Sequence, residues 1–150
     1  MGQQQLLLLV LGIVIVGLAV VVGIQAFSEN QKKANADALV NDAIRISSDA
    51  QAWKLKPGAF GGGASATNWT GVSLLQLGYT VGNNSSTPGT AEADQYENLN
   101  GIFDLSASGV TLTVDANSYQ TDGVTVLNHI VVAVTGTEPS DITTQINPAS

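Results

Sequence analysis

An unbroken apolar run from Leu6 to Ile24 constrains this chain more than any other feature of its sequence. The run reads LLLLVLGIVIVGLAVVVGI and contains no charged side chain. At about 1.5 Å of rise per residue, a helix of this length spans roughly 28 Å, close to the hydrocarbon thickness of a bilayer. Because lipid offers the backbone no hydrogen-bond partners, the run is predicted to be a transmembrane helix.

A removable secretory signal is the competing interpretation of this run. Such a signal has a basic start and a small-residue cleavage site, whereas residues 1–5 read MGQQQ and carry no basic side chain. The run is also longer than the apolar core of a usual signal, which spans about 7–15 residues. We therefore expect the segment to be retained in the working protein.

Small residues within the run indicate contact between helices. Gly12, Gly17 and Gly23 each cost about 1 kcal/mol in a helix interior relative to alanine. Ala19 and Gly23 form a small-xxx-small pair, a spacing that lets two helices approach closely in a membrane. Glycine is also common in membrane helices in general, so helix packing and an ordinary membrane composition both remain open.

The helical period continues beyond the apolar run, so one helix is predicted from about residue 3 to residue 55. Its second half, residues 29–56, is amphipathic, and Val40 and Ile44 widen its apolar stripe. Pro57 and Gly58 then end the helix. The stripe expected to pack on a sheet consists of Ala36, Leu39, Ala43, Ile46, Ala50 and Trp53.

Residues 57–150 are predicted to form a β-rich head. Alternating apolar residues indicate strands at Ile102–Ala107, Val110–Asp115 and Val124–Thr135, with a short fourth at Ile142–Gln145. The faces expected to be buried contain Phe103, Leu105, Ala107, Val110, Leu112, Val114, Val124, Val126, Ile130, Val132 and Val134.

Ser108-Gly109 and Asp122-Gly123 are turn signals, and residues 82–91 are expected to be a loop. Gly71–Val81 is apolar enough to dock on the core as either a strand or a short helix. Since a sheet with one apolar face needs a cover, the fold class is α+β: a long N-terminal helix packed on a small antiparallel sheet.

The composition limits the chemistry of the head. The sequence has no cysteine, and after Pro57 it has no lysine or arginine, while eight of the twelve acidic residues lie there. Such a region repels nucleic acid and anionic lipid. His129 is the only histidine and is expected to be structural. Asp115, Asn117 and Asp122 bracket a turn and are a metal candidate, with an ordinary hairpin turn preferred. We expect no cofactor and no enzymatic activity.

The half-apolar, half-amphipathic helix followed by a loop and an antiparallel sheet resembles the type IV pilin and pseudopilin family. Residues 1–28 carry the specific motif, and SDAQAWKLKPGAFGGG, residues 48–63, is also similar to filament-type pilins. The resemblance implies cleavage and N-methylation by a leader peptidase, either after Gly2 or with Met1 already mature. In the second placement, Gln5 stands where most members carry glutamate, so it cannot form their ion pair with a neighbouring N-terminus.

The resemblance implies a structural subunit that polymerises into an extracellular helical filament from a pool in the inner membrane. Its partners would be other copies and the pilus assembly machinery, with no direct nucleic-acid binding. Met1 and Gln5 would make the inter-subunit N-terminal contact. The filament-core or membrane helix would use Leu6, Leu9, Gly12, Ile13, Val16, Gly17, Ala19, Val20, Gly23 and Ile24.

Two rival functions and one conflict accompany this interpretation. The chain is alternatively a pseudopilin of a secretion system or a single-span anchored module that binds something outside the cell. Lys32 and Lys33 follow the apolar run, and nothing basic precedes it. The positive-inside rule would place the following residues in the cytoplasm, whereas the family places them outside.

Overall fold

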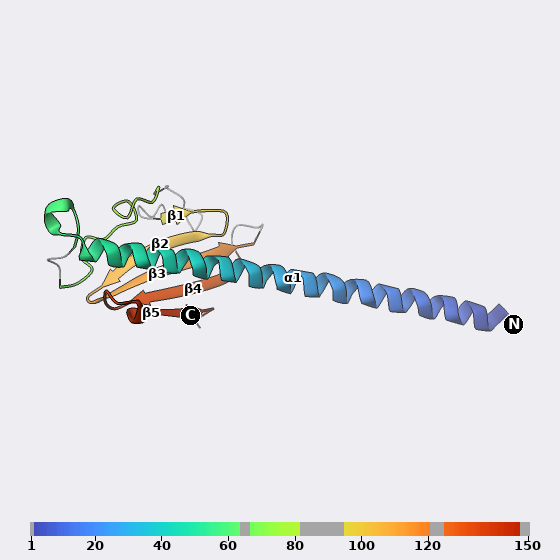
Figure 1. Cartoon of the computed structure of the whole chain (residues 1–150). Coiled ribbons are helices and arrows are strands. Elements are labelled where there is room, and N and C mark those ends of the chain that lie inside the picture. The colour runs from blue at the N-terminus through green and yellow to red at the C-terminus, as the bar shows by residue number, and fades with distance from the viewer. Residues whose placement is uncertain (1, 64–66, 82–94, 121–124, 148–150) are drawn as a thin grey trace. The chain divides into compact units, whose positions relative to one another are not determined.

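A computed structural model describes residues 2–63, 67–81, 95–120 and 125–147 (Figure 1). A single long helix, α1 (Gly2–Leu55), is followed by a short 3-10 helix, η1 (Gly58–Phe60). The strands are β1 (Gln95–Glu97), β2 (Ile102–Ser108), β3 (Thr111–Tyr119), β4 (Val126–Val134) and β5 (Ile142–Ile146), with a 3-10 helix, η2 (Pro139–Asp141), before β5.

The five strands form one antiparallel sheet in the order β1-β2-β3-β4-β5. The predicted α+β class, with one N-terminal helix packed against an antiparallel sheet, is confirmed. The internal contacts divide the chain into two compact units, Met1–Ala34 and Asn35–Ser150. The second unit, here called the head, contains residues 35–55 of α1 and the whole sheet.

The first unit is a bare helix. Every described residue from Gly2 to Ala34 is exposed, and α1 is long and apolar enough to cross a membrane, judged by its length and composition. A signal sequence near the N-terminus satisfies the same two criteria. The predicted helix, from about residue 3 to residue 55, agrees with the observed bounds of α1 to within one residue. Pro57 follows the last helical residue by two positions.

Within the head, residues 35–55 of α1 lie across one face of the sheet (Figure 1). All six residues of the apolar stripe are buried, from Ala36 to Trp53. Val40 is half-buried against the core, and Ser47 and Gln51 are buried, whereas Ile44 is 37% exposed. The stripe therefore widens through Val40 and two polar residues and not through Ile44. Burial of Ser47 is feasible because its hydroxyl donates to the Ala43 carbonyl at 2.8 Å.

Alternation along the central strands builds the facing half of the core. On β3 and β4 every second residue is buried, as expected for strands with one dry face. Leu39, Ala43 and Ile46 of the helix pack in one cluster with strand residues and with Leu74. The strand members of that cluster are Phe103, Val114, Ala116, Ile130 and Val132.

The ends of the strands depart from the prediction. Val110 lies outside any strand and is 63% exposed, because Gly109 adopts a left-handed φ of 60° in the β2–β3 turn. Val126 is 46% exposed, since the β3–β4 register shifts between Ser118 and Tyr119. Asn128 is buried on β4 instead.

Leu105 is only half-buried and Ala107 is exposed, as β2 runs out towards its turn. Val124, the Asp122-Gly123 turn and residues 82–91 lie outside the described residues.

Two further segments differ from their sequence patterns. Strand β1 escaped prediction because it is only three residues long and contains a single apolar side chain, Tyr96. Gly71–Val81 forms neither a helix nor a strand but a series of turns. It docks nevertheless, through the fully buried Leu74.

The packing of Leu39 predicts a stability effect that separates buried from exposed stripe positions. Leu39→Ala removes a side chain with no exposed surface and should lower the free energy of unfolding by about 2–5 kcal/mol. Ile44→Ala, at a partly exposed neighbour outside both core clusters, should cost less than about 1 kcal/mol. Urea unfolding of the full chain in detergent, followed by tryptophan fluorescence, measures both. Equal losses in the two variants would contradict this helix-to-sheet packing.

Candidate functional site

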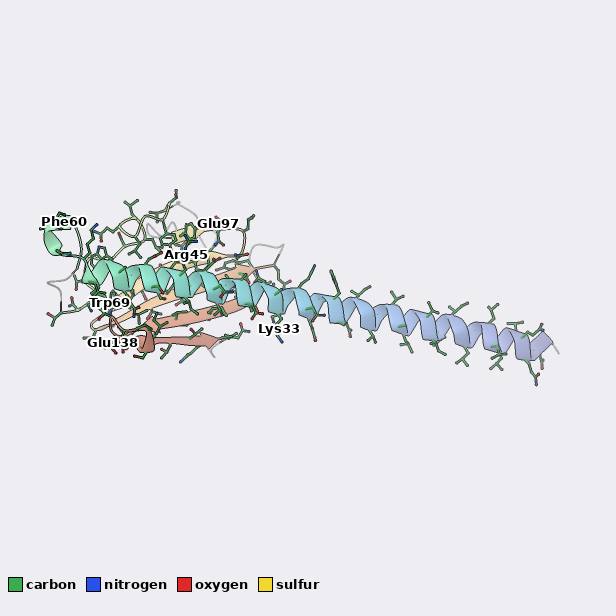
Figure 2. All side chains as sticks on the ribbon, in the orientation of Figure 1. Lys33, Arg45, Phe60, Trp69, Glu97 and Glu138 are labelled. Atoms are coloured by element: carbon green, nitrogen blue, oxygen red, sulfur yellow. The ribbon has the colours of Figure 1, made fainter. Side chains whose placement is uncertain are left out.

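The most extensive exposed apolar surface among the described residues is formed by residues 6–24, which are apolar on every side of the helix. Figure 2 shows bulky side chains standing out from α1 along this whole segment. Their exposed fractions run from 50% at Leu11 to 70% at Leu7. No soluble domain leaves so continuous an apolar surface in contact with water, so this surface requires lipid or other apolar partners.

The predicted small residues of the segment have no packing role within the described chain. A Cβ added at Gly12, Gly17 or Gly23 would meet nothing within 4 Å. Alanine would therefore fit at each position, and would favour the helix by roughly 0.5–1 kcal/mol. The described residues offer no internal reason for glycine at these three positions.

Three of the small residues share one face of the helix. Gly12 and Ala19 are seven residues apart, and Ala19 and Gly23 are four apart, so all three lie on one side. Gln5, which is exposed, lies seven residues before Gly12 and belongs to the same side. The sequence interpretation recognised the Ala19–Gly23 pair but missed that Gly12 and Gln5 extend it. Met1 lies outside the described residues.

The head begins at a polar junction around Asn35. The Asn35 amide donates to the Asn100 carbonyl at 3.0 Å, and its oxygen accepts from the Asn128 amide at 3.0 Å. Seven residues later, Asp42 accepts hydrogen bonds from Asn98 at 2.9 Å and Asn100 at 2.7 Å. These contacts fasten the helix to the turn between β1 and β2 and explain why the buried Asn128 is tolerated.

The other end of the head is closed around Trp53. Its indole nitrogen donates to the Gly61 carbonyl at 3.0 Å, and the Gly63 N–H donates back to the Trp53 carbonyl at 3.0 Å. A Cβ on Gly63 would lie 2.5 Å from the Trp53 ring, so only glycine allows the chain to pass this closely. Residues Gly61–Gly63 therefore fold back against the C-terminal end of α1.

Side chains outside the apolar stripe add further contacts at this end. The Gln51 amide donates to the Gly136 carbonyl at 3.0 Å and to the Glu138 carbonyl at 2.8 Å. Lys54 lies over the ring of the buried Trp69, 4.1 Å from its centroid, in cation–π geometry. Figure 2 labels Trp69 and Glu138 near the end of the helix in the head.

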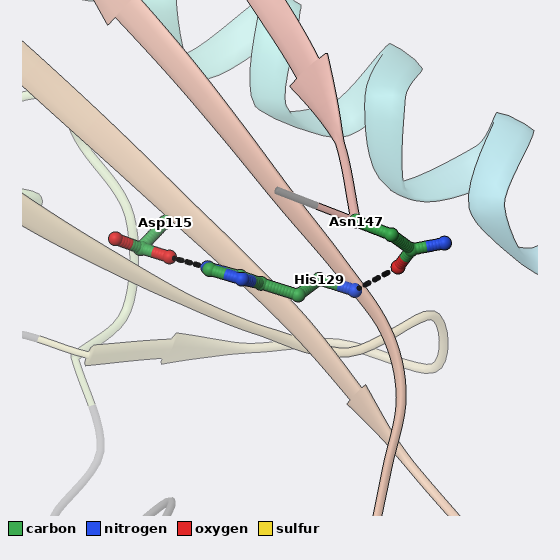
Figure 3. Close-up of polar contacts among 3 residues, drawn as sticks. All are labelled: Asp115, His129 and Asn147. Atoms are coloured by element: carbon green, nitrogen blue, oxygen red, sulfur yellow. Dashed lines mark hydrogen bonds and ion pairs between the residues drawn. The ribbon is translucent and has the colours of Figure 1, made fainter. Parts of the chain in front are cut away.

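The single histidine links two strands on the outer face of the sheet. His129 Nε2 contacts an Asp115 carboxylate oxygen, and the His129 backbone N–H donates to the Asn147 side-chain oxygen at 2.9 Å (Figure 3). The Asn147 N–H donates in turn to the His129 carbonyl. Within the described residues, no hydroxyl hydrogen-bonds to the His129 ring, so this arrangement lacks the nucleophile of a catalytic triad.

The metal candidate of the sequence interpretation is not assembled among the described residues. Asp115 and Asn117 lie on the same face of β3, with Asn117 opposite His129 in the register, but Asp115 is already engaged by His129. Asp122 lies outside the described residues. In the part of the chain that the structure describes, no three His, Cys, Asp or Glu side chains are arranged to hold a metal ion.

A tyrosine that the sequence interpretation did not single out ties the Gly71–Val81 segment to the helix. The Tyr79 hydroxyl donates to Asp49 at 2.5 Å, and its ring lies 4.9 Å from that of Tyr96, which lies 5.9 Å from Phe103. Burial, reinforced by the hydrogen bond and the negative charge of Asp49, raises the pKa of Tyr79 well above its ordinary value.

In comparisons with known proteins, no family model, no curated protein and no solved structure matches this chain.

The raised pKa of Tyr79 predicts a pH-dependent contribution to stability. A group whose pKa is higher in the folded state stabilises fully below its unfolded pKa, here about 10, and loses that contribution as the pH rises further. Tyr79→Phe should therefore be less stable than the wild type at pH 7, with the difference shrinking above about pH 10. Urea unfolding of both proteins across this range tests the prediction, and a constant difference would contradict it.

Proposed function

We propose that this chain is the structural subunit of a helical filament of the type IV pilin class, assembled through residues 6–24. The observation that carries the proposal is the exposed apolar run of residues 6–24, whose glycines have no packing role among the residues that the structure describes. The pilin-like architecture, with this helix at the N-terminus and an antiparallel sheet behind it, supports the proposal. The other copies of the chain would be the missing partners of the helix.

The free energy of the exposed surface explains why assembly would start in a membrane. Burying a Leu, Val or Ile side chain is worth about 1.5–3 kcal/mol, so the whole run is worth on the order of tens of kcal/mol. In the inner membrane this surface would contact lipid. In the filament it would contact neighbouring helices, so it would pass from lipid to protein without meeting water.

The glycines favour close helix packing over a simple anchor. Because lipid contributes no hydrophobic drive between helices, association in a membrane depends on van der Waals contact and close backbone approach. Gly12, Ala19 and Gly23 provide three small positions on one side for such an approach, with Val16 on the same side between Gly12 and Ala19. Gln5 on the same side would contribute a hydrogen bond between subunits, where the family's glutamate would form an ion pair.

The head would form the outer sleeve of the filament. It carries most of the acidic residues and, beyond Pro57, no basic residue, which suits a solvated surface and disfavours direct binding of nucleic acid. The resemblance adds the leader peptidase and the assembly machinery as partners and the cell surface as the location. On this proposal the chain is not an enzyme and binds no cofactor.

A single-span anchored binding module is the second candidate, because α1 satisfies the length and composition of a plain membrane anchor. Electron microscopy of sheared surface material separates the two functions, since an anchored monomer gives no filaments. N-terminal mass analysis of the same material tests whether residues 6–24 are retained. A secretion pseudopilin would give only short filaments that stay below the surface.

A charge within the apolar run is expected to abolish assembly. Val14 is 52% exposed, and Val14→Asp would place a carboxylate in the filament core at a cost of about 2.5–3.5 kcal/mol per copy even in a membrane. We expect no filaments by electron microscopy. Ser106→Asp, which adds the same charge at an exposed position of the head, is the control and should assemble normally. Intact filaments from Val14→Asp would refute the proposal.

Bulk on the small-residue side should weaken assembly without affecting membrane insertion. Gly12→Leu fits the isolated helix, where a Cβ meets nothing within 4 Å, but would hold neighbouring helices apart. We expect at least about a tenfold loss of filament mass, with the membrane pool unchanged. Val21→Leu, on the opposite side of the helix, is the matched control and should assemble normally. Equal filament yields from the two variants would argue against the glycine contact.

A further inference from the structure

The turn between β1 and β2 contains Asn100-Gly101, the single Asn-Gly dipeptide in the sequence. In this dipeptide the backbone nitrogen attacks the asparagine side chain readily, because glycine has no Cβ to shield the nitrogen or restrict the backbone. The packing of the head nevertheless requires glycine here. A Cβ on Gly101 would collide with the Asn117 carbonyl oxygen and would lie 2.8 Å from Leu39 Cδ2. A chemically reactive pair is therefore built into the fold.

In the folded head, hydrogen bonds hold both groups that would react. The Asn100 side-chain amide donates to Asp42 at 2.7 Å, and the Gly101 N–H donates to the Asn98 side-chain oxygen at 3.1 Å. That oxygen also accepts from the Asn100 N–H at 2.8 Å. The Asn98 N–H closes the turn by donating to the Gly101 carbonyl at 3.0 Å. The amide is thus held towards the helix, and the proton of the attacking nitrogen is engaged.

The backbone of Asn100 is fixed from the helix as well. The Asn35 side chain donates to the Asn100 carbonyl at 3.0 Å, and Asn100 is half-buried. To react, the Asn100 side chain must leave Asp42 and turn towards the Gly101 nitrogen, so several of these bonds must break together. The reaction therefore has to wait for a local opening of the turn.

We propose that Asn100 is a site of spontaneous deamidation, which the folded head suppresses and whose product releases the turn from the helix. In the opened turn the Gly101 nitrogen forms a bond to Asn100 Cγ and gives up its proton. The Cγ–Nδ2 bond breaks, and the amide nitrogen leaves with that proton as ammonia. Water then adds to one carbonyl carbon of the cyclic imide and opens the ring, which gives aspartate or isoaspartate. Only water is consumed, because no electrons are gained or lost.

The product cannot make the contact that holds Asn100 to the helix. A carboxylate has no N–H to donate, and it would face the Asp42 carboxylate across the length of the former hydrogen bond, where like charges repel. Isoaspartate also adds one carbon atom to the main chain of the turn. Since the released ammonia is lost to water, the extent of conversion records how long the turn has been open. This inference does not depend on the proposed filament function.

The rate of conversion in the full chain tests the site. Wild-type protein in non-ionic detergent is incubated at mildly alkaline pH with and without guanidinium chloride. Cleavage after glutamate releases residues 98–138, and fragment masses locate the conversion of amide to acid. We expect conversion at Asn100 to be at least about tenfold faster in the denaturant, where no opening step is needed. Equal rates would overturn the suppression by the fold, and no conversion in the unfolded chain would overturn the site.

A pair of helix variants tests the contact with Asp42. Asp42→Ala removes the acceptor of the Asn100 amide and should speed conversion in the folded chain severalfold. Asp37→Ala, at an exposed position of the same helix, is the control and should leave the rate unchanged. Equal rates in the two folded variants would overturn the role of this contact. If tryptophan fluorescence shows that Asp42→Ala is unfolded, the comparison of folded and unfolded wild type decides alone.

A mimic of the product tests the release of the turn. Asn100→Asp should lower the urea midpoint of the head, because it replaces the donor to Asp42 with a second carboxylate. Asn68→Asp adds the same charge at a side chain whose oxygen already accepts from the Thr70 N–H and hydroxyl, so its midpoint should stay close to that of the wild type. Equal shifts in the two variants would overturn the proposed effect of deamidation.

Discussion

The structure depends on one constraint, which is that a single helix must satisfy two different environments along its length. Residues 35–55 find their apolar partner within the chain, because the sheet covers Leu39, Ala43 and Ile46. Residues 6–24 find none among the described residues, since each of their side chains is exposed. The hydrophobic effect makes the second situation untenable in water, so this half of the helix needs lipid or another apolar surface around it.

The sequence predicted this division because both halves of the helix follow patterns that depend on local spacing alone. A continuous apolar run and a heptad stripe can be recognised without knowledge of the fold, and Pro57 fixes the end of the helix. The central strands were equally accessible, since alternation along β3 and β4 reflects one dry face. The fold class therefore followed from local signals.

The parts that sequence reasoning missed depend on contacts between residues that are distant in the chain. Strand β1 exists because Tyr96 pairs with Phe103 on β2, and nothing within its own three residues indicates a strand. Asn128 is buried because Asn35, 93 positions earlier, accepts its hydrogen bond. Periodicity carries no information about such partners.

The head also indicates how the bare half of the helix would work. Ala36, Ala43 and Ala50 recur every seven residues, and all three are buried, so small residues at this spacing let the sheet approach the helix backbone. Gly12 and Ala19 repeat the same spacing in the first half of the helix. In that half, Gly12 is smaller than the alanines of the head, and no element among the described residues packs against it. Glycine allows a second helix to approach closely in an apolar environment. Small residues at this spacing would therefore let the helix of a neighbouring copy pack against residues 6–24, as they let the sheet pack against residues 35–55.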